Sequence, residues 1–468
     1  MSDPTIAQRF AALIDAPAIR RPAPAHLARA VTYALDTLAV TLAGFVAPSS
    51  GPVVRTLMAA AGAPQATLFG VGRVTSPWDA ALGNGAMAHA LELDDDHRIA
   101  VLHPGAVVVP AAFAVAEATG ASGHDFLTGL LAGYEVACRL GEVFRGSQFY
   151  HGVHPTPLCG VFGAALAAAS ILKLDQAAAT RALGIAGTQA SGLTEWKADG
   201  SWIKRLHPGR AAHAGVLSAY LAREGFTGPA TIIEGPGGFF NAFGYGEPRD
   251  LDALNAGLGT ELHGVGTAIK PYPCCRFAHG AIDLAIDAHR ANLDPKSIAA
   301  IRMRIYRTDV LSYHAVPINP VDAQFNLPYV VATALSAGQV TLGDFTAEAI
   351  RRPALLDLCR RTSVIEDPAF NAKYPDEYWV ELAIEFTDGR RQTLTSTCPS
   401  GDPEAARYAA DPGLLHREAQ AKARALLAEC GFGAVIEPLI AAIERLPQAS
   451  DVRDVAALLG KPPNAAVD

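Results

Sequence analysis

The sequence has few cysteines, and their spacing excludes the usual cysteine-based sites. Seven cysteines occur among 468 residues, and none forms a Cys-x-x-Cys pair. An odd number without that spacing indicates neither a disulfide framework nor a zinc site. Cys274 and Cys275 are adjacent, which is poor geometry for holding one metal ion together. We therefore expect reduced, mostly structural thiols.

The sequence also lacks a basic stripe and long apolar runs. The formal net charge is −8, and the lysines and arginines are scattered, which argues against a nucleic-acid partner. No uninterrupted apolar run reaches the ~18 residues of a membrane span, and no charged and apolar signal segment opens the chain. We therefore expect no nucleic acid, no membrane and a cytoplasmic location.

Motifs for covalent or nucleotide chemistry are absent as well. No Gly-x-Ser-x-Gly nucleophile elbow occurs, and the glycine-rich stretch at 235–238 lacks both the Lys-Ser/Thr ending of a phosphate loop and the spacing of a dinucleotide fingerprint. By elimination, the sequence predicts acid–base chemistry on a small anion without an organic cofactor.

The chain does have many apolar residues, and their spacing is typical of helices. Hydrophobic residues make up 50% and charged residues 18%, which at this length predicts large buried cores and two or more domains. Many of the expected helices are rich in alanine on several faces, as buried helices are. Apolar residues recur at three- and four-residue spacing over 26–47, 105–119, 125–144, 160–172, 175–187 and 210–223.

The pattern changes near residue 270 and returns to helical after 400. Residues 301–306 alternate as in a strand, 378–386 and 392–396 read as a hairpin with an Asp-Gly turn, and 329–337 and 347–361 read as helices. Further helices are expected at 414–430 and 435–445. We predict a mainly α protein, with a discontinuous all-helical domain of residues 1–268 and 400–468 and a smaller α+β lid domain of residues 269–399. The cleft between two such domains is a favoured site for a small ligand.

Three His-Pro pairs stand out, at His103, His154 and His207. With 14 histidines and 32 prolines in 468 residues, random pairing would give about one such pair. Proline suits the first turn of a helix and disfavours the α conformation of the residue before it. Each histidine is therefore expected at the start of a helix, beside free N–H groups that favour anions. A simple turn is the alternative for any one pair, but the three together favour an anion site.

The segment 84–103 is the densest in reactive groups. Carboxylates this close cannot all ionise cheaply, so at least one is expected to have a raised pKa and to act as a general acid or base. The alternative is a solvated acidic helix end. EF-hand spacing and a His-x-x-x-His pair are absent, so we predict no metal. The groups are Glu92, Asp94, Asp95, Asp96, His97, Arg98 and His103.

Two further segments supply positive charge. Lys204 lies three residues before His207-Pro208, where its ammonium could bind a carboxylate beside the expected helix start. Lys270 and Arg276 lie in a proline-stiffened stretch at the expected crossing between the domains. For each basic residue alone, a place on the surface is an equal alternative. Together they suit proton abstraction next to a carboxylate, because they could stabilise the developing enolate charge.

At these residues the chain resembles the MmgE/PrpD family over nearly its whole length. The resemblance rests on the His-x-Leu-Asp-x-Asp-Asp stretch leading to His103-Pro104, the mid-chain His154-Pro155, the Lys-x-Leu-His segment at Lys204 and the Lys-x-Tyr/Phe-Pro segment at Lys270. The family includes 2-methylcitrate dehydratase, cis-aconitate decarboxylase and iminodisuccinate epimerase. The resemblance implies a large all-helical domain, a smaller α+β lid and a homodimer.

The resemblance also implies roles for individual residues. His103 and Lys204 would form the proton-transfer centre, His154 and Lys270 would hold carboxylates, and Asp94 or Asp95 would orient or protonate the substrate. Two positions differ from the family pattern: Glu92 stands for its first aspartate, and Asp96 aligns with a threonine of the decarboxylases, with one extra residue before His103. These differences change the size and charge of the pocket. The remaining substrate-binding candidates are His207, Tyr329 and His97, of which Tyr329 resembles the family tyrosine.

The leading expectation is a cofactor-independent hydro-lyase that dehydrates a citrate-like di- or tricarboxylate. An epimerase of a dicarboxylate such as iminodisuccinate would need proton donors on both faces of one carbon and would release nothing. A cis-aconitate-type decarboxylase is a further possibility within the family. A catalytically inactive carboxylate-binding homologue is the alternative from outside the enzymes.

Overall fold

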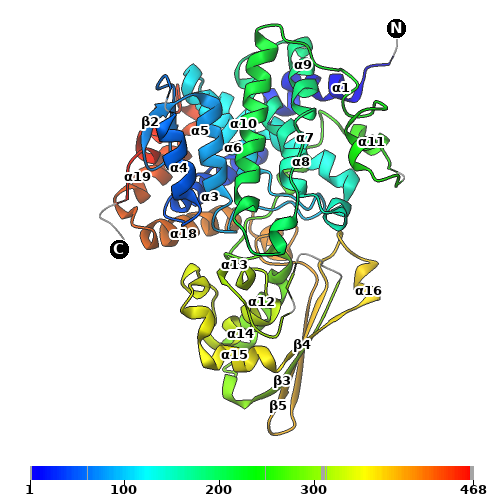
Figure 1. The fold of residues 1–468 in the computed structure, drawn as a ribbon, viewed down its shortest axis with the longest axis vertical. Helices are drawn as coiled ribbons and strands as arrows, with labels where there is room; N and C mark the ends of the chain where they lie inside the picture. The colour runs from blue at the N-terminus through cyan, green and yellow to red at the C-terminus, as the bar shows by residue number, and fades with distance from the viewer. Residues whose placement is uncertain (1–2, 61, 248, 307–310, 313, 464–468) are drawn as a thin grey trace.

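The chain forms a larger helical part and a smaller α+β part (Figure 1). This computed structural model describes residues 3–60, 62–247, 249–306, 311–312 and 314–463. In Figure 1 the orange and red C-terminal helices lie beside the blue N-terminal helices, so both ends of the chain belong to the helical part. Its helices are α1 (Ile6–Ala12), α2 (Pro17–Arg20), α3 (Pro24–Gly44), α4 (Ser50–Ala59), α5 (Pro77–Ala88), α6 (Gly105–Thr119), α7 (Gly123–Phe144), α8 (Pro155–Ile171), α9 (Gln176–Gly187), α10 (Ile203–Arg223), α11 (Phe239–Phe243), α17 (Ala406–Ala410), α18 (Leu414–Glu429), α19 (Ile436–Glu444) and α20 (Arg453–Leu459).

Two of the three His-Pro pairs begin helices, as the sequence predicts. Helix α6 starts directly after His103-Pro104, and His154 is the N-cap residue of α8. The prediction was wrong for the third pair, because α10 begins at Ile203 and Pro208 lies inside it. Proline within a helix removes one intrahelical hydrogen bond, and here the surrounding helix tolerates that loss. Lys204 therefore lies in the first turn of α10 instead of before the helix.

Close packing of α5 on α10 brings two reactive segments together. A Cβ atom on Gly209 of α10 would lie 2.2 Å from the carbonyl oxygen of Leu82, and one on Gly85 of α5 would lie 2.8 Å from the Cα of Gly209. Only glycine permits this backbone approach. The contact holds the first turn of α10, with Lys204, against the end of α5, where the acidic segment begins.

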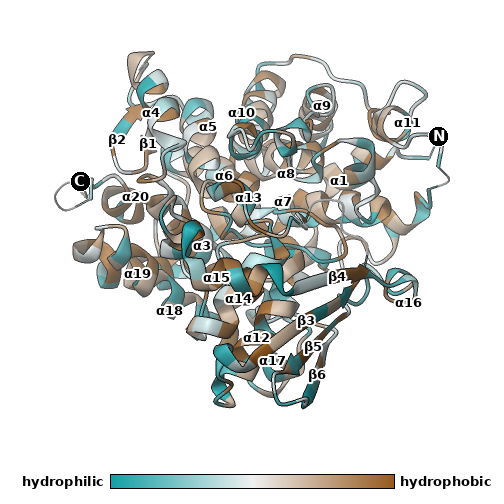
Figure 2. Cartoon of the chain, turned by 60° about the horizontal axis from the view of Figure 1, so that its bottom comes forward, coloured by the Kyte–Doolittle hydropathy of each residue, from teal (hydrophilic) through white to brown (hydrophobic). Residues whose placement is uncertain are grey.

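The α+β part contains a four-stranded sheet in the order β4-β3-β5-β6. Strand β3 pairs parallel with β4 and antiparallel with β5, so that Ile301 lies between Thr362 and Ile384. Brown and teal residues alternate along β3 and β5 in Figure 2, as expected for strands with one buried face. The elements are α12 (His279–Arg290), β3 (Ile298–Ile305), α13 (Pro320–Ala323), α14 (Leu327–Ala337), α15 (Pro353–Arg360), β4 (Thr362–Glu366), α16 (Pro368–Asn371), β5 (Val380–Phe386) and β6 (Arg391–Ser396).

Three features differ from the sequence predictions. The helical part contains a small hairpin of β1 (Ala66–Leu68) and β2 (Gly72–Thr75), so it is not purely helical. Strand β4 was not predicted. The helix expected at 347–361 is interrupted at Arg352, because the residue before Pro353 is extended and α15 begins only at that proline.

The buried apolar side chains form two separate clusters. One joins side chains between Ile6 and Ile269 to others between Tyr408 and Leu459, and the other consists of residues 274–386 together with Trp196. The C-terminal helix α18 packs on α3 within the first cluster. The domain boundaries at 268/269 and 399/400 stay a prediction. No helix among the described residues is both long and apolar enough to cross a membrane.

Candidate active site

The acidic segment runs from the end of α5 to the start of α6 and contacts the α+β part, where Gln324 donates to the carbonyl oxygen of Leu91. Asp96 forms a two-way backbone pairing with Ala268, with N–O distances of 2.7 and 2.9 Å. The backbone N–H of His97 donates instead to the carbonyl oxygen of Leu102, at 2.8 Å. Successive side chains of an extended segment point to opposite sides. The side chains of Asp96 and His97 therefore face different environments.

His103 is arranged as a neutral base. Its Nδ1 lies 2.6 Å from the carbonyl oxygen of Asp95, so Nδ1 carries the hydrogen and donates it. The ring nitrogen left to accept a proton is Nε2. Burial, assisted by the positive charge of Lys270, holds the pKa of His103 well below its usual range. The ring is therefore uncharged near neutral pH and can take up a proton.

Asp96 is arranged as the matching acid. Its Oδ1 lies 3.7 Å from Nδ1 of His103, and its buried Oδ2 has no hydrogen-bond partner within the described residues. Burial raises the pKa of Asp96 to about 7, even though Arg276 and Lys270 act to lower it. A base and an acid whose pKa values are displaced in opposite directions are the usual signature of an acid–base pair.

A chain of hydrogen bonds leads from Asp94 through His89 to Lys204. Nδ1 of His89 lies 2.7 Å from Oδ2 of Asp94, and Nε2 of His89 lies 2.8 Å from Nζ of Lys204. Because the ammonium can only donate, His89 accepts at Nε2 and donates at Nδ1. Burial would raise the pKa of Asp94, but His89 and Lys270 hold it below its usual range. Asp94 therefore stays ionised and fixes the ring that positions Lys204.

Glu92 joins the two lysines. It is paired with Lys204, and the Nζ of Lys270 lies 3.7 Å from its Oε2 and 3.1 Å from its carbonyl oxygen. Burial opposes ionisation, but the charges of Lys204 and Lys270 lower the pKa of Glu92 to about 2. The backbone at Glu92 has a positive φ of 55°, a strained conformation of the kind that clusters at functional sites.

The two lysines have opposite pKa shifts. Burial lowers the pKa of Lys204, despite the charge of Glu92. At Lys270 burial acts in the same direction, but the charges of Asp94, Glu92 and Asp96 outweigh it and raise the pKa. Lys270 is therefore the more firmly charged of the two, as suits a group that holds a carboxylate.

The side chain of Asp95 connects the acidic segment to α6 and α7. Its Oδ1 accepts the backbone N–H of Gly105 at 2.9 Å, and its Oδ2 accepts the hydroxyl of Tyr134 at 2.6 Å. Burial raises the pKa of Asp95 well above its usual value. Because its carbonyl oxygen receives Nδ1–H of His103, Asp95 determines the tautomer of that ring.

His154 and His207 form a second layer beside His89. Their Nδ1 atoms lie 3.2 Å apart, and the rings of His154 and His89 stack with centroids 5.6 Å apart. Burial lowers the pKa of both, to about 4 for His207. Nε2 of His154 is buried and has no partner among the described residues.

A cavity lies where these groups meet. About 20 Å³ of it is open to the centres of water molecules, which is room for roughly one water. Three cationic and two acidic side chains line it together with aromatic rings, an arrangement that suits a small polyanion in a site shielded from solvent. The lining residues are Glu92, Asp96, Val101, His103, Phe149, Lys204, Lys270, Cys275, Arg276, Phe277 and Phe325.

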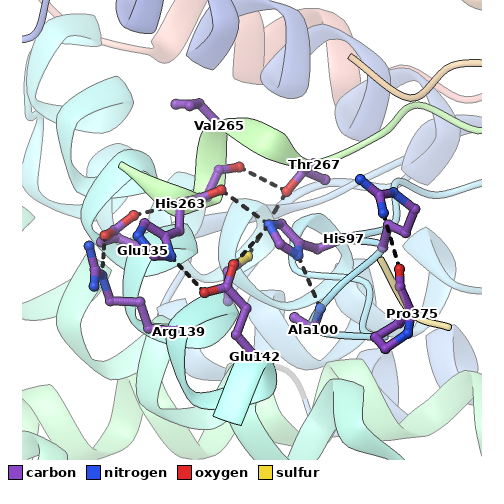
Figure 3. Close-up of polar contacts among 12 residues, drawn as sticks. His97, Ala100, Glu135, Arg139, Glu142, His263, Val265, Thr267 and Pro375 are labelled. Carbon is purple, nitrogen blue, oxygen red and sulfur yellow. Dashed lines mark hydrogen bonds and ion pairs between the residues drawn. The ribbon is translucent and has the colours of Figure 1, made fainter. Parts of the chain in front are cut away.

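Four of the predicted substrate-binding residues do not line this cavity: Asp95 and His207, described above, and two that lie elsewhere. His97 lies with His263 and Glu142 (Figure 3), where its Nε2 donates to the carbonyl oxygen of His263 at 3.1 Å. Its Nδ1 accepts the N–H of Ala100 at 3.2 Å. The hydroxyl of Tyr329 donates to the carbonyl oxygen of Asp344 inside the α+β part. Neither side chain lines the cavity.

Sequence reasoning used His89 only as the first residue of the His-x-Leu-Asp-x-Asp-Asp stretch, and it counted neither His89 nor Arg276 among the site residues. His89 falls within the acidic segment, five residues before Asp94, but nothing in that spacing shows that its ring reaches Lys204. Arg276 was noticed at the crossing between the parts, and it lines the cavity. In the described part of the chain, no group of three or more His, Cys, Asp or Glu side chains is arranged to hold a metal ion.

Comparison with known proteins adds independent findings. The model of the MmgE/PrpD N-terminal domain matches residues 8–252, and that of the MmgE/PrpD C-terminal domain matches residues 272–430. The cis-aconitate decarboxylase-like protein oryM of Aspergillus oryzae is 27% identical over 456 residues, 92% of each chain. Cis-aconitate decarboxylase of Aspergillus terreus is 30% identical over 81% of this chain and 82% of its own. The enzyme of that name from Mus musculus is 27% identical over 82% and 79%.

Proposed function

The chain belongs to the MmgE/PrpD family, and we propose that it is a cofactor-independent lyase that abstracts a proton next to a carboxylate of a small di- or tricarboxylate. The observation that carries the proposal is the pairing of His103 with Asp96. Nδ1 of His103 is committed to a backbone carbonyl, and the pKa of the neighbouring carboxyl is raised to about 7. One group is thus suited to take a proton and the other to give one.

The reaction begins with binding of the substrate carboxylates by Lys270 and Arg276, which line the cavity. Nε2 of His103 then takes the proton from the carbon next to a carboxylate. The charge that develops on the carboxylate oxygens is stabilised by the ammonium of Lys204, which the hydrogen bond from its Nζ to His89 holds in place. That positioning matters because the stabilising donor has to be in place before the charge develops.

Dehydration of a hydroxy acid is the favoured outcome. Loss of a hydroxyl group needs a proton donor, since hydroxide is a poor leaving group. Asp96, with its raised pKa, supplies that proton, so that water departs as the carbon–carbon double bond forms. Before the next cycle, His103 releases the proton it took from the substrate and Asp96 takes up a proton, directly or through solvent.

Decarboxylation is the second candidate, and the names of the relatives favour it. In that case the bond to a carboxylate breaks, carbon dioxide leaves, and the resulting carbanion takes a proton from an acid such as Asp96. An epimerase would use His103 and a second donor on the opposite face of one carbon. A binding protein without catalysis is the remaining alternative.

Proton exchange observed by NMR separates these reactions. The protein is incubated in deuterated water with citrate-like hydroxy acids, cis-aconitate and dicarboxylates, before and after exhaustive treatment with EDTA. Deuterium uptake with formation of an unsaturated acid indicates a dehydratase, release of carbon dioxide a decarboxylase, and exchange with inversion an epimerase. No exchange with any acid would contradict the proposed lyase and favour the binding protein.

The proposal includes an assembly and a domain organisation. We propose that the protein is a homodimer. Each subunit has a helical domain of residues 1–268 and 400–468 and a lid of residues 269–399. Two separate apolar clusters support the division. Light scattering after size-exclusion chromatography tests the dimer, and a monomeric mass would contradict it.

A further inference from the structure

A second pocket lies directly outside the cavity. About 300 Å³ of it is open to the centres of water molecules, and residues 196–200 of the helical part and residues around Phe325 of the α+β part line it. Phe325 also lines the inner cavity. The two spaces are therefore separated at this ring, and the outer one is the larger by far.

Two aromatic rings lie at the boundary of these spaces, because Phe325 lines both and Trp196 lines the outer pocket. The ring centroids of Trp196 and Phe325 lie 5.2 Å apart, with an angle of 50° between the ring planes. Nζ of Lys204 lies 5.7 Å from the centroid of Trp196 and 5.4 Å from that of Phe325. The rings thus cover the ammonium of Lys204 on the side of the outer pocket, at a distance that allows a cation–π attraction.

The two sides of this closure are held very differently. The side chain of Gln324, next to Phe325, donates to the carbonyl oxygens of Leu91 and Pro273, at 3.3 and 3.1 Å, and accepts from Arg205 at 3.3 Å. Phe325 is therefore anchored to the acidic segment, to the crossing between the parts and to α10. It forms the fixed side.

The side that carries Trp196 is held by packing and not by side-chain hydrogen bonds of the indole. Its segment runs between Gly192 and Gly200, whose φ angles of 126° and 72° lie in the region that favours glycine. The indole Nε1 of Trp196 is buried and has no hydrogen-bond partner among the described residues, and Leu193 beside it is 69% exposed. Backbone hydrogen bonds of 3.0 Å from His154 to Gly192 and from Thr194 to Gly152 fix the start of this segment, so movement is confined to the part that carries Trp196 and ends at Gly200.

We propose that Trp196 and Phe325 form a gate between the outer pocket and the cavity, and that this gate selects carboxylates by size. Trp196 swings out with residues 195–200, hinged at Gly200, while Phe325 stays in place. The inner cavity holds only about one water with the gate closed, so a carboxylate fits only after the lining has moved, and the larger outer pocket makes this gate the proposed route. The proposal rests on the proposed function only for the identity of the molecule that passes.

Cys275 provides a probe of the gate that needs no turnover. It lines the inner cavity, whereas Cys159 lies in the helical core and is fully buried. Methyl methanethiosulfonate transfers its methylthio group to a thiol and releases methanesulfinate, and mass spectrometry follows each cysteine separately. We expect Phe325→Ala and Trp196→Ala to raise the modification rate of Cys275 about tenfold or more, because access follows the population of the open state.

Matched variants make the test decisive. Ile318→Ala changes the outer pocket without touching the gate and should keep the wild-type rate at Cys275. Trp196→Phe and Phe325→Leu, which keep more of the packing, should give smaller increases in the same direction. A benzyl thiosulfonate should gain more from Phe325→Ala than the methyl reagent does.

Two results would overturn the gate. One is an unchanged rate at Cys275 in all the gate variants. The other is a parallel increase at Cys159, which would show general loosening of the fold. Failure of every carboxylate to react would contradict the proposed lyase but would leave this measurement intact.

Discussion

Two clusters of histidines and carboxylates lie on opposite sides of the same acidic segment, and the pKa values of His103 and His263 are displaced in opposite directions. Within the cavity, burial and nearby lysines hold the pKa of His103 well below its usual range. On the other side, a 2.6 Å hydrogen bond to Glu142 raises the pKa of His263. Both clusters combine histidine with carboxylates. The residue types are therefore not what decides whether a histidine serves as a base or as half of an ion pair. Its closest partner and its degree of burial decide this.

The difference follows from which group satisfies Nδ1 of each ring. His103 donates to a backbone carbonyl, which carries no charge, while Asp94 and Asp96 remain 3.8 and 3.7 Å away. His263 meets a carboxylate directly and is partly open to solvent. The cavity side is therefore arranged for proton transfer and the outer side for stability.

The largest effect is expected at His103. His103→Asn removes the group that takes the substrate proton, so turnover should fall ~10²–10⁴-fold. Steady-state kinetics with the acid identified by NMR measures the loss. His97→Asn is the matched control on the other side of the segment and should keep turnover within about tenfold. Comparable losses in both variants, each melting within a few degrees of wild type, would break the distinction between the two clusters.

The next effect is expected at the two lysines. Lys204→Met removes a donor whose stabilisation acts on charge developed in the transition state, so turnover should fall on the order of a hundredfold or more. Lys270→Met mainly removes a carboxylate-binding charge, so KM should rise more than kcat falls. Measuring kcat and KM for both variants tests this, and identical patterns in the two would contradict the separate roles.

How far the sequence predicts the fold is clear from the His-Pro pairs. The starts of α6 and α8 could be predicted, because proline restricts the residue before it and suits the first helical turn. The start of α10 could not, because the helix begins before His207-Pro208 and absorbs the lost hydrogen bond at Pro208. Local rules fail where packing, here of α10 on α5, supplies the stabilisation.

The candidate site shows the same limit. Composition and spacing predict a dense acidic segment, but they do not show that Asp96 turns towards the lysines while His97 turns towards Glu142. That divergence depends on backbone pairing of Asp96 with Ala268, which is distant in the sequence. The contact between His89 and Lys204 likewise depends on the packing of two helices. Sequence resemblance also did not show that the hydroxyl of Tyr329 donates to Asp344 and lies outside the cavity lining.

A smaller effect is expected in the pH dependence. The pKa of Asp96 is raised to about 7 by burial, and the reaction needs its protonated form, which is lost as the pH rises. For dehydration, kcat/KM should therefore decline above about pH 7. Asp96→Asn should lower the rate about tenfold or more and remove that decline. Asp388→Asn, at the exposed hairpin turn, should leave the profile unchanged, and a decline that persists in Asp96→Asn would assign it to another group.

The smallest effect is expected in the stability supplied by the outer cluster. Glu142 raises the pKa of His263 above 6.5, so this contribution is fully present below that pH and is lost as the pH rises through the folded-state value. The same hydrogen bond lowers the pKa of Glu142 below 4.5, although burial acts to raise it. The stabilisation from ionised Glu142 is therefore lost as the pH falls through this lowered pKa. The pair should therefore stabilise the fold most between about pH 4.5 and 6.5.

A double-mutant cycle measures this coupling. His263→Gln, Glu142→Gln and the double variant should give a coupling free energy of about 0.5–1 kcal/mol at about pH 5.5, the range of partly exposed ion pairs. Thermal or denaturant unfolding repeated at about pH 8.5 should show a smaller value, because neutral His263 keeps only an uncharged hydrogen bond. Turnover by the same variants, measured at one pH, should stay close to that of the wild type, in contrast to the large loss expected for His103→Asn. Equal coupling at both pH values would show that His263 does not gain its charge from Glu142, and the two clusters would then no longer differ in the way their pKa shifts require.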